Sequence, residues 1–379
     1  TKLAIDRVTV GEVGVVIGRM YGIGSFGAIL GVLLSGYFLI SMLGSRGTVV
    51  LVAAVYFFMG VSYLLALKTH ILASLILPLS ITIFFANFLQ IDDRIRGTCL
   101  VESGYFCIQT QDLKQFDGQV RLIALDHLVH SINDKNKPML LHSPYIHFVD
   151  EYVERRFGNS PPRAFFIGGG GYTLPRAWIA KYRGLADLTI AEIDPEVTEV
   201  AKNSLWFDPV NSKTVIHHRD ARYALNQGPS KGDFDLIFGD AFHDVSIPSH
   251  LVTREFNEII RKNLNFRGVY IVNVVDSSFR PRFLFSFVKT LSLSFPAVEV
   301  WFEAGVKRNS GRVTFTVVAS NSFIDEEYLY SEKGHERSWW RWPEVKLNQA
   351  VSLLDVPILT DDKAPVNKLM SSTILDKKL

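Results

Sequence analysis

The chain has 379 residues, a net charge of +2 at neutral pH, 48% hydrophobic residues and only two cysteines. A charge this close to zero gives no general affinity for nucleic acid, and no Cys/His spacing of the zinc-binding kind occurs, so we expect neither nucleic acid nor metal as a ligand. The length allows two or three domains, and the apolar excess lies before residue 91.

Three apolar runs in this first part predict transmembrane helices. They cover residues 20–43, 48–67 and 71–89, and each is close to the roughly 20 residues that cross a hydrocarbon core. Two further runs follow the first at once, which disfavours a cleaved signal peptide. We therefore expect an integral membrane protein, in contact with lipid over residues 1–91.

The first run carries small residues at helical spacing. Gly22, Gly27 and Gly31 would let another helix approach closely. We expect this face to pack on transmembrane helices of the same protein type or of a separate subunit, and a homodimer is one such arrangement. The chain begins with Thr1 rather than Met, which indicates processing or a longer parent chain.

Residues 92–158 predict a small domain with a β-hairpin and a helix. Residues 97–110 and 118–126 alternate apolar and polar side chains, as the two strands of a hairpin do. A polar segment follows, and then a helix at 144–157. The Asn-Ser-Pro-Pro stretch at 159–162 is a natural linker to the next domain.

Residues 159–322 alternate strands and helices, which predicts a parallel, doubly wound α/β sheet. Strands are expected at 163–167, 187–192, 213–217, 234–239 and 268–275. Two further strands, expected at 297–303 and 312–319, are joined by a polar loop, which predicts an antiparallel hairpin. A hairpin in that place is typical of the Rossmann-like sheet of class I methyltransferases. The tail, residues 323–379, reads as irregular.

A glycine-rich loop followed by two acidic strand ends predicts a nucleoside site. Phe165–Ile167 is an apolar strand that runs into the four glycines Gly168, Gly169, Gly170 and Gly171. Glycines let the backbone approach a ligand, and a carboxylate such as Glu192 at the end of the next strand can hold ribose hydroxyls. Asp240 ends a later strand, where open α/β sheets bind their ligands.

Cys99 and Cys107 could flank the hairpin, but we expect two reduced thiols. Reduced cysteines and a nucleoside ligand suit the cytosol or an organelle matrix derived from it. Charge around the apolar runs does not set an orientation. We therefore expect the soluble domain on the cytosolic or matrix side of the membrane.

Together these segments resemble the spermidine synthase (aminopropyltransferase) family, in its membrane-fused bacterial-type branch. The resemblance rests on the glycine loop and on six further segments: Glu102-Ser103-x-Tyr105, Leu125-Asp126-His127, Glu192-Ile193-Asp194, Asp220, Gly239-Asp240-Ala241-Phe242 and Leu359-Thr360-Asp361-Asp362-x-Ala364-Pro365-Val366. That branch joins a membrane half with more helices than are seen here to a synthase half. The resemblance covers most of the chain.

The resemblance implies S-adenosylmethionine or its decarboxylated form as cofactor and a small amine-like substrate. It implies that Gly168–Gly171 lie beside the sulfur and ribose, Glu192 on the ribose hydroxyls, and Asp220 near the adenine amine. Asp240 then accepts the proton of the attacking amine. The resemblance also places Tyr145 and Asp126 on the substrate. From the residues alone, Asp220 could instead cap a helix, and Asp361 with Asp362 could anchor the tail.

One departure from the family's loop bears on specificity. Spermidine synthases carry an aspartate that grips the aminopropyl amine, where this chain has Gly171 followed by Tyr172. Asp244 also lies four rather than three residues after Asp240. Because a buried ammonium needs a paired charge, preference for the decarboxylated cofactor should fall, while a sulfonium nucleoside should still bind.

Three classes of function follow. The first is a membrane-anchored transferase of an aminopropyl or methyl group. The second is a catalytically decayed relative that serves as an accessory or assembly subunit, and the third is a transporter with a nucleoside-binding domain. Retention of Glu192, Asp220 and Asp240 favours the first over the second. The apolar runs 48–67 and 71–89 lack a charge at mid-span, which argues against the third.

Overall fold

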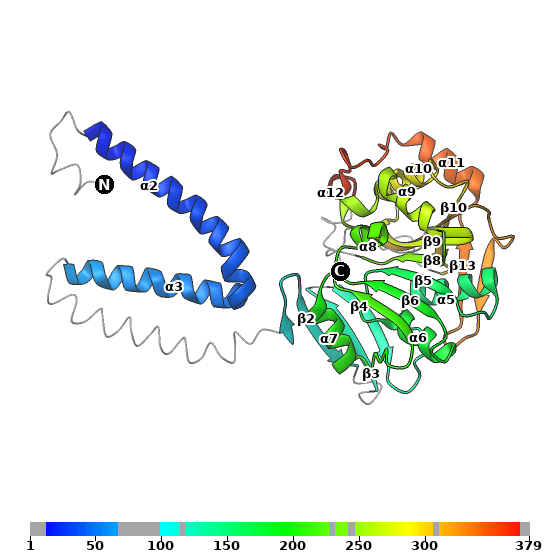
Figure 1. Cartoon of the computed structure of the whole chain (residues 1–379). Helices are drawn as coiled ribbons and strands as arrows, with labels where there is room; N and C mark the ends of the chain where they lie inside the picture. Colours follow the sequence, from blue (N-terminus) through cyan, green and yellow to red (C-terminus); the bar gives the residue numbers. More distant parts are fainter. Residues whose placement is uncertain are drawn as a thin grey trace. The chain divides into compact units, whose positions relative to one another are not determined.

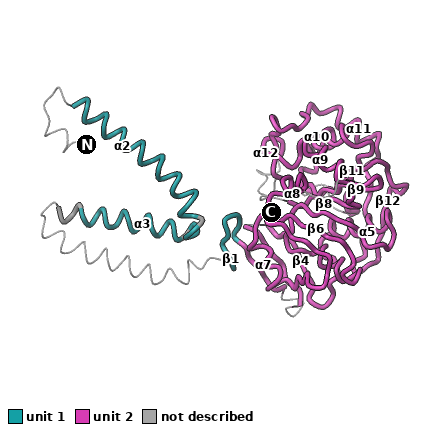
Figure 2. Tube along the Cα trace, in the orientation of Figure 1, with its two compact units in different colours: residues 1–107 teal, residues 108–379 magenta. Residues whose placement is uncertain are grey.

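The computed structural model describes seven stretches of the chain: residues 13–66, 99–113, 119–126, 128–227, 232–241, 247–305 and 311–371. The chain divides into two compact units, residues 1–107 and 108–379 (Figure 2). We describe each unit by itself.

The first unit contains two long apolar helices. Helix α2 spans Val13–Leu34, a π-helical stretch η1 covers Ser35–Leu39, and α3 spans Ile40–Ala66 (Figure 1). By length and composition, Val13–Leu39 and Met42–Ser62 could each cross a membrane. The expected third span, residues 71–89, lies outside the described residues. The described part therefore supports two of the three predicted spans.

The cysteines are bonded to each other, so the expectation of two reduced thiols was wrong. Cys99 and Cys107 form a disulfide, with their Cα atoms 5.2 Å apart. A tight turn brings them together, because the Ser103 hydroxyl accepts the backbone N–H groups of Tyr105 and Phe106 at 3.1 and 2.9 Å. Disulfides persist in oxidising compartments, so the cysteines give no support to a cytosolic or matrix position.

A four-stranded sheet follows, in the order β1-β2-β3-β4. Its strands are β1 (Val101–Glu102), β2 (Cys107–Asp112), β3 (Val120–Leu125) and β4 (Leu128–Asp134). Strand β3 pairs antiparallel with both β2 and β4. Strand β4 was missed in the sequence, where its polar residues read as a loop. Helix α5 (Pro144–Phe157) comes next.

The remaining strands form one nine-stranded sheet in the order β12-β13-β10-β11-β9-β8-β5-β6-β7 (Figure 1). Strands β5 to β9 are parallel to one another, and β11 is antiparallel to β9 and β10. The predicted parallel sheet with an antiparallel end is therefore confirmed. The strands are β5 (Arg163–Ile167), β6 (Asp187–Ala191), β7 (Lys213–His217), β8 (Phe234–Gly239), β9 (Leu264–Ser277), β10 (Ala297–Glu303), β11 (Arg312–Ser320), β12 (Tyr328–Ser331) and β13 (Arg337–Arg341).

Helices cover both faces of this sheet. Phe165 and Ile167 of β5 lie in the core that α8, α9 and α10 complete, whereas Phe166 between them packs edge-on against Trp178 of α6. Successive strand residues point to opposite faces, so a strand buried on both faces reads as an unbroken apolar run. The helices are α6 (Thr173–Lys181), α7 (Pro195–Ser204), α8 (Ala221–Gln227), α9 (Arg254–Asn263) and α10 (Arg282–Leu291).

As far as residue 371, the C-terminal tail is ordered, whereas the sequence predicted an irregular tail. It contributes β12 and β13 to the sheet and also forms α11 (Glu344–Leu353) and α12 (Val366–Leu369). Asp361 anchors it, because its carboxylate accepts two hydrogen bonds from Arg222, at 2.7 and 2.6 Å, and one from the Thr253 hydroxyl at 2.7 Å. These bonds hold the pKa of Asp361 below its ordinary value. Asp362 beside it is exposed.

We expect Asp361→Asn to lower the free energy of unfolding by about 1 kcal/mol, since it weakens a bidentate but partly exposed ion pair. Asp362→Asn is the matched control and should change stability by less than about 0.5 kcal/mol. Denaturant unfolding of the full chain in detergent measures both. Equal losses from the two variants would mean that Asp361 does not anchor the tail.

Candidate functional site

The candidate site lies where the strand order of the sheet reverses. Strand β5 has β6 on one side and β8 on the other, and the chain visits β6 and β7 before crossing back to β8. Ligands of open α/β sheets bind at such a switch point, beyond the carboxyl ends of the strands. The register places Ile167 beside Ala191 and Gly239. The glycine loop, Glu192 and Asp240 therefore leave the sheet side by side.

The first two glycines of the loop have no room for a side chain, because other atoms of the protein lie too close. A Cβ on Gly168 would lie 2.9 Å from the backbone oxygen of Asp240. A Cβ on Gly169 would lie 2.6 Å from the ring of Tyr172, which is fully buried in the left-handed conformation at φ 54°. The Tyr172 ring stacks on Phe207, with ring centroids 4.2 Å apart. The Asp240 backbone and the Tyr172 ring thus pack against the loop without a ligand.

Strand β4 fixes the other side of the loop. The Ser131 hydroxyl accepts the Gly171 N–H at 2.9 Å, and the Asn133 amide donates to the Gly171 carbonyl at 2.9 Å. A Cβ on Gly171 would lie 2.4 Å from the Cβ of Ser131. Ser131 therefore occupies the space into which an acidic side chain at position 171 would extend. Neither Ser131 nor Asn133 was singled out in the sequence.

Glu192 is buried against the loop. One carboxylate oxygen accepts the Gly169 N–H at 2.7 Å, and the other accepts the Asp194 N–H at 3.0 Å. Burial raises the pKa of Glu192, and these backbone bonds oppose that shift. A carboxylate has about four lone-pair positions, so it keeps acceptor capacity beyond these bonds. The carboxylate can thus accept further donors such as ribose hydroxyls, and the ribose contact remains a prediction.

Asp240 is held between two side chains at the end of β8. The Tyr145 hydroxyl donates to one carboxylate oxygen at 3.1 Å, and the Asn273 amide donates to the other at 3.0 Å. Burial raises the pKa of Asp240 to about 7, although both hydrogen bonds oppose the shift. The structure thus joins two predicted site residues, Tyr145 and Asp240. Asn273, which the sequence did not mark, completes the cluster.

The other two predicted residues lie elsewhere. Asp220 accepts the Tyr223 N–H at 3.0 Å at the start of α8 and contacts the His250 ring at 2.7 Å. The helix-capping alternative for Asp220 is therefore what the structure shows, and the adenine contact stays a prediction. Asp126 lies at φ 55° in the turn between β3 and β4. Its contact with substrate likewise stays a prediction.

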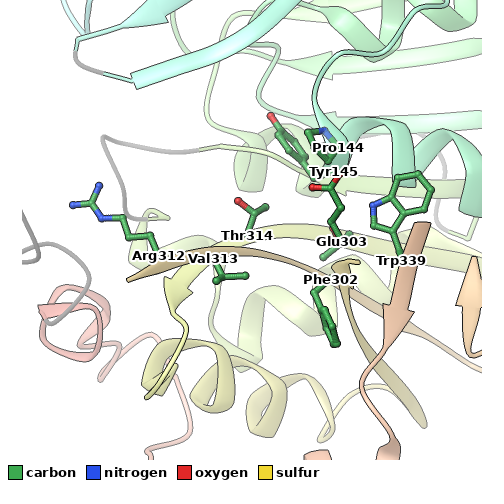
Figure 3. Close-up of a pocket in the computed structure, with 9 residues that line it drawn as sticks. Pro144, Tyr145, Phe302, Glu303, Arg312, Val313, Thr314 and Trp339 are labelled. Atoms are coloured by element: carbon green, nitrogen blue, oxygen red, sulfur yellow. The ribbon is translucent and has the colours of Figure 1, made fainter. Parts of the chain in front are cut away.

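A pocket of about 200 Å³ opens beside Tyr145 (Figure 3). Strand β11 forms its floor with Thr314 and Thr316, and β10 contributes Glu303. Trp339 of β13 closes one side. Tyr145 both lines this pocket and donates to Asp240, so the pocket and the Asp240 carboxylate share one side chain.

Strand order and site geometry define a class I methyltransferase-like domain with a carboxylate beside its glycine loop. A probable spermidine synthase from Corynebacterium glutamicum has this fold, with a TM-score of 0.59 and 18% identity over 69% of this chain and 95% of that one. No model of a protein family matches the chain.

Two curated relatives narrow the comparison. A polyamine aminopropyltransferase of Vibrio vulnificus is 36% identical over 123 residues, which is 32% of this chain and 40% of the relative. A probable polyamine aminopropyl transferase of Bifidobacterium longum is 28% identical over 223 residues, 54% of this chain and 48% of the relative. The chain thus spans less than half the length of either relative. Both similarities support the resemblance to aminopropyltransferases.

The packing of Ser131 on the loop determines what an acid introduced at position 171 should do. Gly171→Asp alone should lower the free energy of unfolding by about 1–3 kcal/mol, because its side chain overlaps Ser131. Adding Ser131→Gly should recover part of that loss. Only the double variant should gain affinity for the decarboxylated cofactor over S-adenosylmethionine. Thermal unfolding and calorimetric titration of parent, single and double variants measure this. A fully stable Gly171→Asp variant would contradict the packing.

Proposed function

We propose that the chain is an aminopropyltransferase-like enzyme. It binds a sulfonium nucleoside, S-adenosylmethionine or its decarboxylated form, and transfers an alkyl group to an amine-like acceptor. One observation carries the proposal: a carboxylate with its pKa raised to about 7 stands beside the glycine loop, oriented by Tyr145 and Asn273. Perturbed carboxyls in such positions are frequent in catalytic sites.

The proton of the acceptor sets the role of Asp240. An amine attacks carbon only through its free lone pair, so the ammonium must first lose a proton. Asp240 can take that proton near neutral pH, because its pKa is about 7. In the transfer a nitrogen–carbon bond forms as the carbon–sulfur bond breaks. The sulfonium supplies a good leaving group, and it departs as a neutral thioether.

Asn273 adds a second reason to expect an amine at this point. Its side-chain oxygen is buried and has no hydrogen-bond partner among the described residues, while its amide nitrogen donates to Asp240. A buried acceptor without a donor costs about 1–3 kcal/mol. An acceptor amine that gives one N–H to Asn273 and another to Asp240 would satisfy both groups and fix its direction of attack.

The residues that face the loop also fit a nucleoside. Glu192 is held on the loop's amides with lone pairs to spare. The choice between aminopropyl and methyl transfer depends on what meets the cofactor's tail. Ser131 fills the space beside Gly171, so the loop offers no acid there. The names of the curated relatives support aminopropyl transfer.

A decayed accessory subunit is the second candidate and is less well supported. Burying a carboxylate until its pKa rises to about 7 costs folding free energy. A protein released from catalysis gains nothing from keeping that cost.

The apolar helices α2 and α3 support a membrane anchor as part of the proposal. A Cβ at Gly22, Gly27 or Gly31 would meet nothing within 4 Å among the described residues, so this face has room for a partner helix.

Asp240→Asn should lower turnover by about 10²-fold or more and leave nucleoside affinity unchanged. In the parent, turnover should rise with pH through an apparent pKa near 7, as Asp240 loses its proton. The Asp240→Asn variant should not show this rise of turnover with pH. Stability has the opposite pH dependence. In the folded protein the pKa of Asp240 lies above its ordinary value of 3.8, so the contribution of Asp240 to stability is complete below pH 3.8 and is lost as the pH rises through about 7.

The variant should therefore be more stable than the parent at pH 8, because an amide does not ionise. Steady-state rates across pH, with unfolding at pH 6 and pH 8, check both statements. Unchanged turnover would remove Asp240 from the mechanism.

Glu192→Gln should weaken the binding of methylthioadenosine about 10- to 100-fold, the loss of one charge-assisted hydrogen bond or a little more. Glu196→Gln, an exposed change in the first turn of α7, is the control and should bind as the parent does. Calorimetric titration of the detergent-solubilised chain measures all three. Equal affinities for the parent and Glu192→Gln would refute the ribose assignment.

A further inference from the structure

The pocket beside Tyr145 contains a hydrogen-bond donor that nothing in the described structure uses. Trp339 is 2% exposed and lines the pocket, yet its indole N–H has no partner among the described residues. In Figure 3 the indole nitrogen lies on the side of the ring that faces Glu303. A buried donor of this kind costs about 1–3 kcal/mol unless an acceptor fills the space in front of it.

Glu303 supplies the complementary group. It pairs with Trp339 across β10 and β13, and its side chain is 29% exposed. Burial raises the pKa of Glu303, and Arg337 opposes the shift. No hydrogen bond to its carboxylate occurs among the described residues, so its oxygens can accept from a ligand.

The cation beside Glu303, Arg337, limits which ligand suits it. The Arg337 Nε lies 3.7 Å from the Glu303 carboxylate, and its terminal nitrogens donate to the backbone oxygens of Leu141 and His142 at 3.0 and 2.6 Å. One carboxylate with a guanidinium nitrogen 3.7 Å away leaves no excess negative charge for a second ammonium.

A hydroxyl group satisfies both unused partners at once. Its oxygen accepts from an indole N–H, and its own hydrogen donates to a carboxylate. An ammonium can donate to Glu303 but offers no lone pair to Trp339. An alkyl chain satisfies neither. The pocket, at about 200 Å³, has several times the roughly 30 Å³ that a water occupies in the liquid, so a short chain fits.

We propose that this pocket binds the hydroxyl end of an amino alcohol, with Trp339 as donor and Glu303 as acceptor. The inference rests on the proposed function, because it takes the amine end to lie at Asp240. Tyr145 connects the two ends, since it lines the pocket and donates to Asp240. The chain would then discriminate among acceptor amines by what lies at their far end.

Calorimetric titration of the full chain in detergent, saturated with methylthioadenosine, tests the site without requiring turnover. The probes are 4-aminobutan-1-ol, 1,4-diaminobutane and 1-aminobutane. The amino alcohol should bind at least about tenfold more tightly than 1-aminobutane, the worth of one to two hydrogen bonds, and more tightly than the diamine. Trp339→Phe keeps an aromatic ring but removes the N–H, and should bring the amino alcohol within about twofold of 1-aminobutane.

Trp340→Phe is the matched control, because the Trp340 side chain is half exposed and packs on Tyr328 rather than lining the pocket. It should bind all three probes as the parent does. The inference would be overturned if the parent protein bound 1,4-diaminobutane more tightly than 4-aminobutan-1-ol, or bound neither of these two probes. So would an unchanged preference in Trp339→Phe. If the binding pattern holds but no group transfer occurs, the proposed function fails and the pocket assignment stands.

Discussion

The close approach of the glycine loop to Asp240 is the constraint on which the rest of the site depends. Parallel pairing sets Ile167 beside Gly239, and the Asp240 N–H donates to the Ile167 carbonyl at 2.9 Å. Any side chain at position 168 would meet the Asp240 backbone. The carboxylate is therefore fixed beside the loop by the sheet's own hydrogen bonds. No ligand is needed to assemble that arrangement.

The small N-terminal sheet completes the site from the other side. Ser131 and Asn133 of β4 bond the two backbone groups of Gly171, and Asn133 also accepts the Thr173 hydroxyl at 2.7 Å. Two polar residues of β4 thus bond the glycine loop, and one of them also bonds the start of α6. That pairing sets the loop's shape and excludes an acid at position 171. The same strand carries His130, whose carbonyl lies 3.4 Å from the Tyr145 hydroxyl.

Much of the α/β sheet could be predicted because its strands are buried on both faces. The run Phe165-Phe166-Ile167 and the loop that follows it identify β5, and Asp240 follows from its place after β8. Strand β4 could not be predicted, because Ser131 and Asn133 look like loop residues until their partners at Gly171 are known. The disulfide was not predicted, because two cysteines eight residues apart do not by themselves indicate the turn at Ser103. Trp339 read as part of an irregular tail, because its place depends on a distant partner strand, β10.

Binding of an adenosine–sulfur compound tests the central claim most directly. Methylthioadenosine can be titrated calorimetrically into the detergent-solubilised full chain at pH 8 and at pH 6. We expect saturable binding at one site per chain, and protection from exchange of the amide hydrogens of the loop residues Gly168 to Gly171. Absence of heat and of protection at both pH values would contradict a nucleoside site at the junction of β5, β6 and β8.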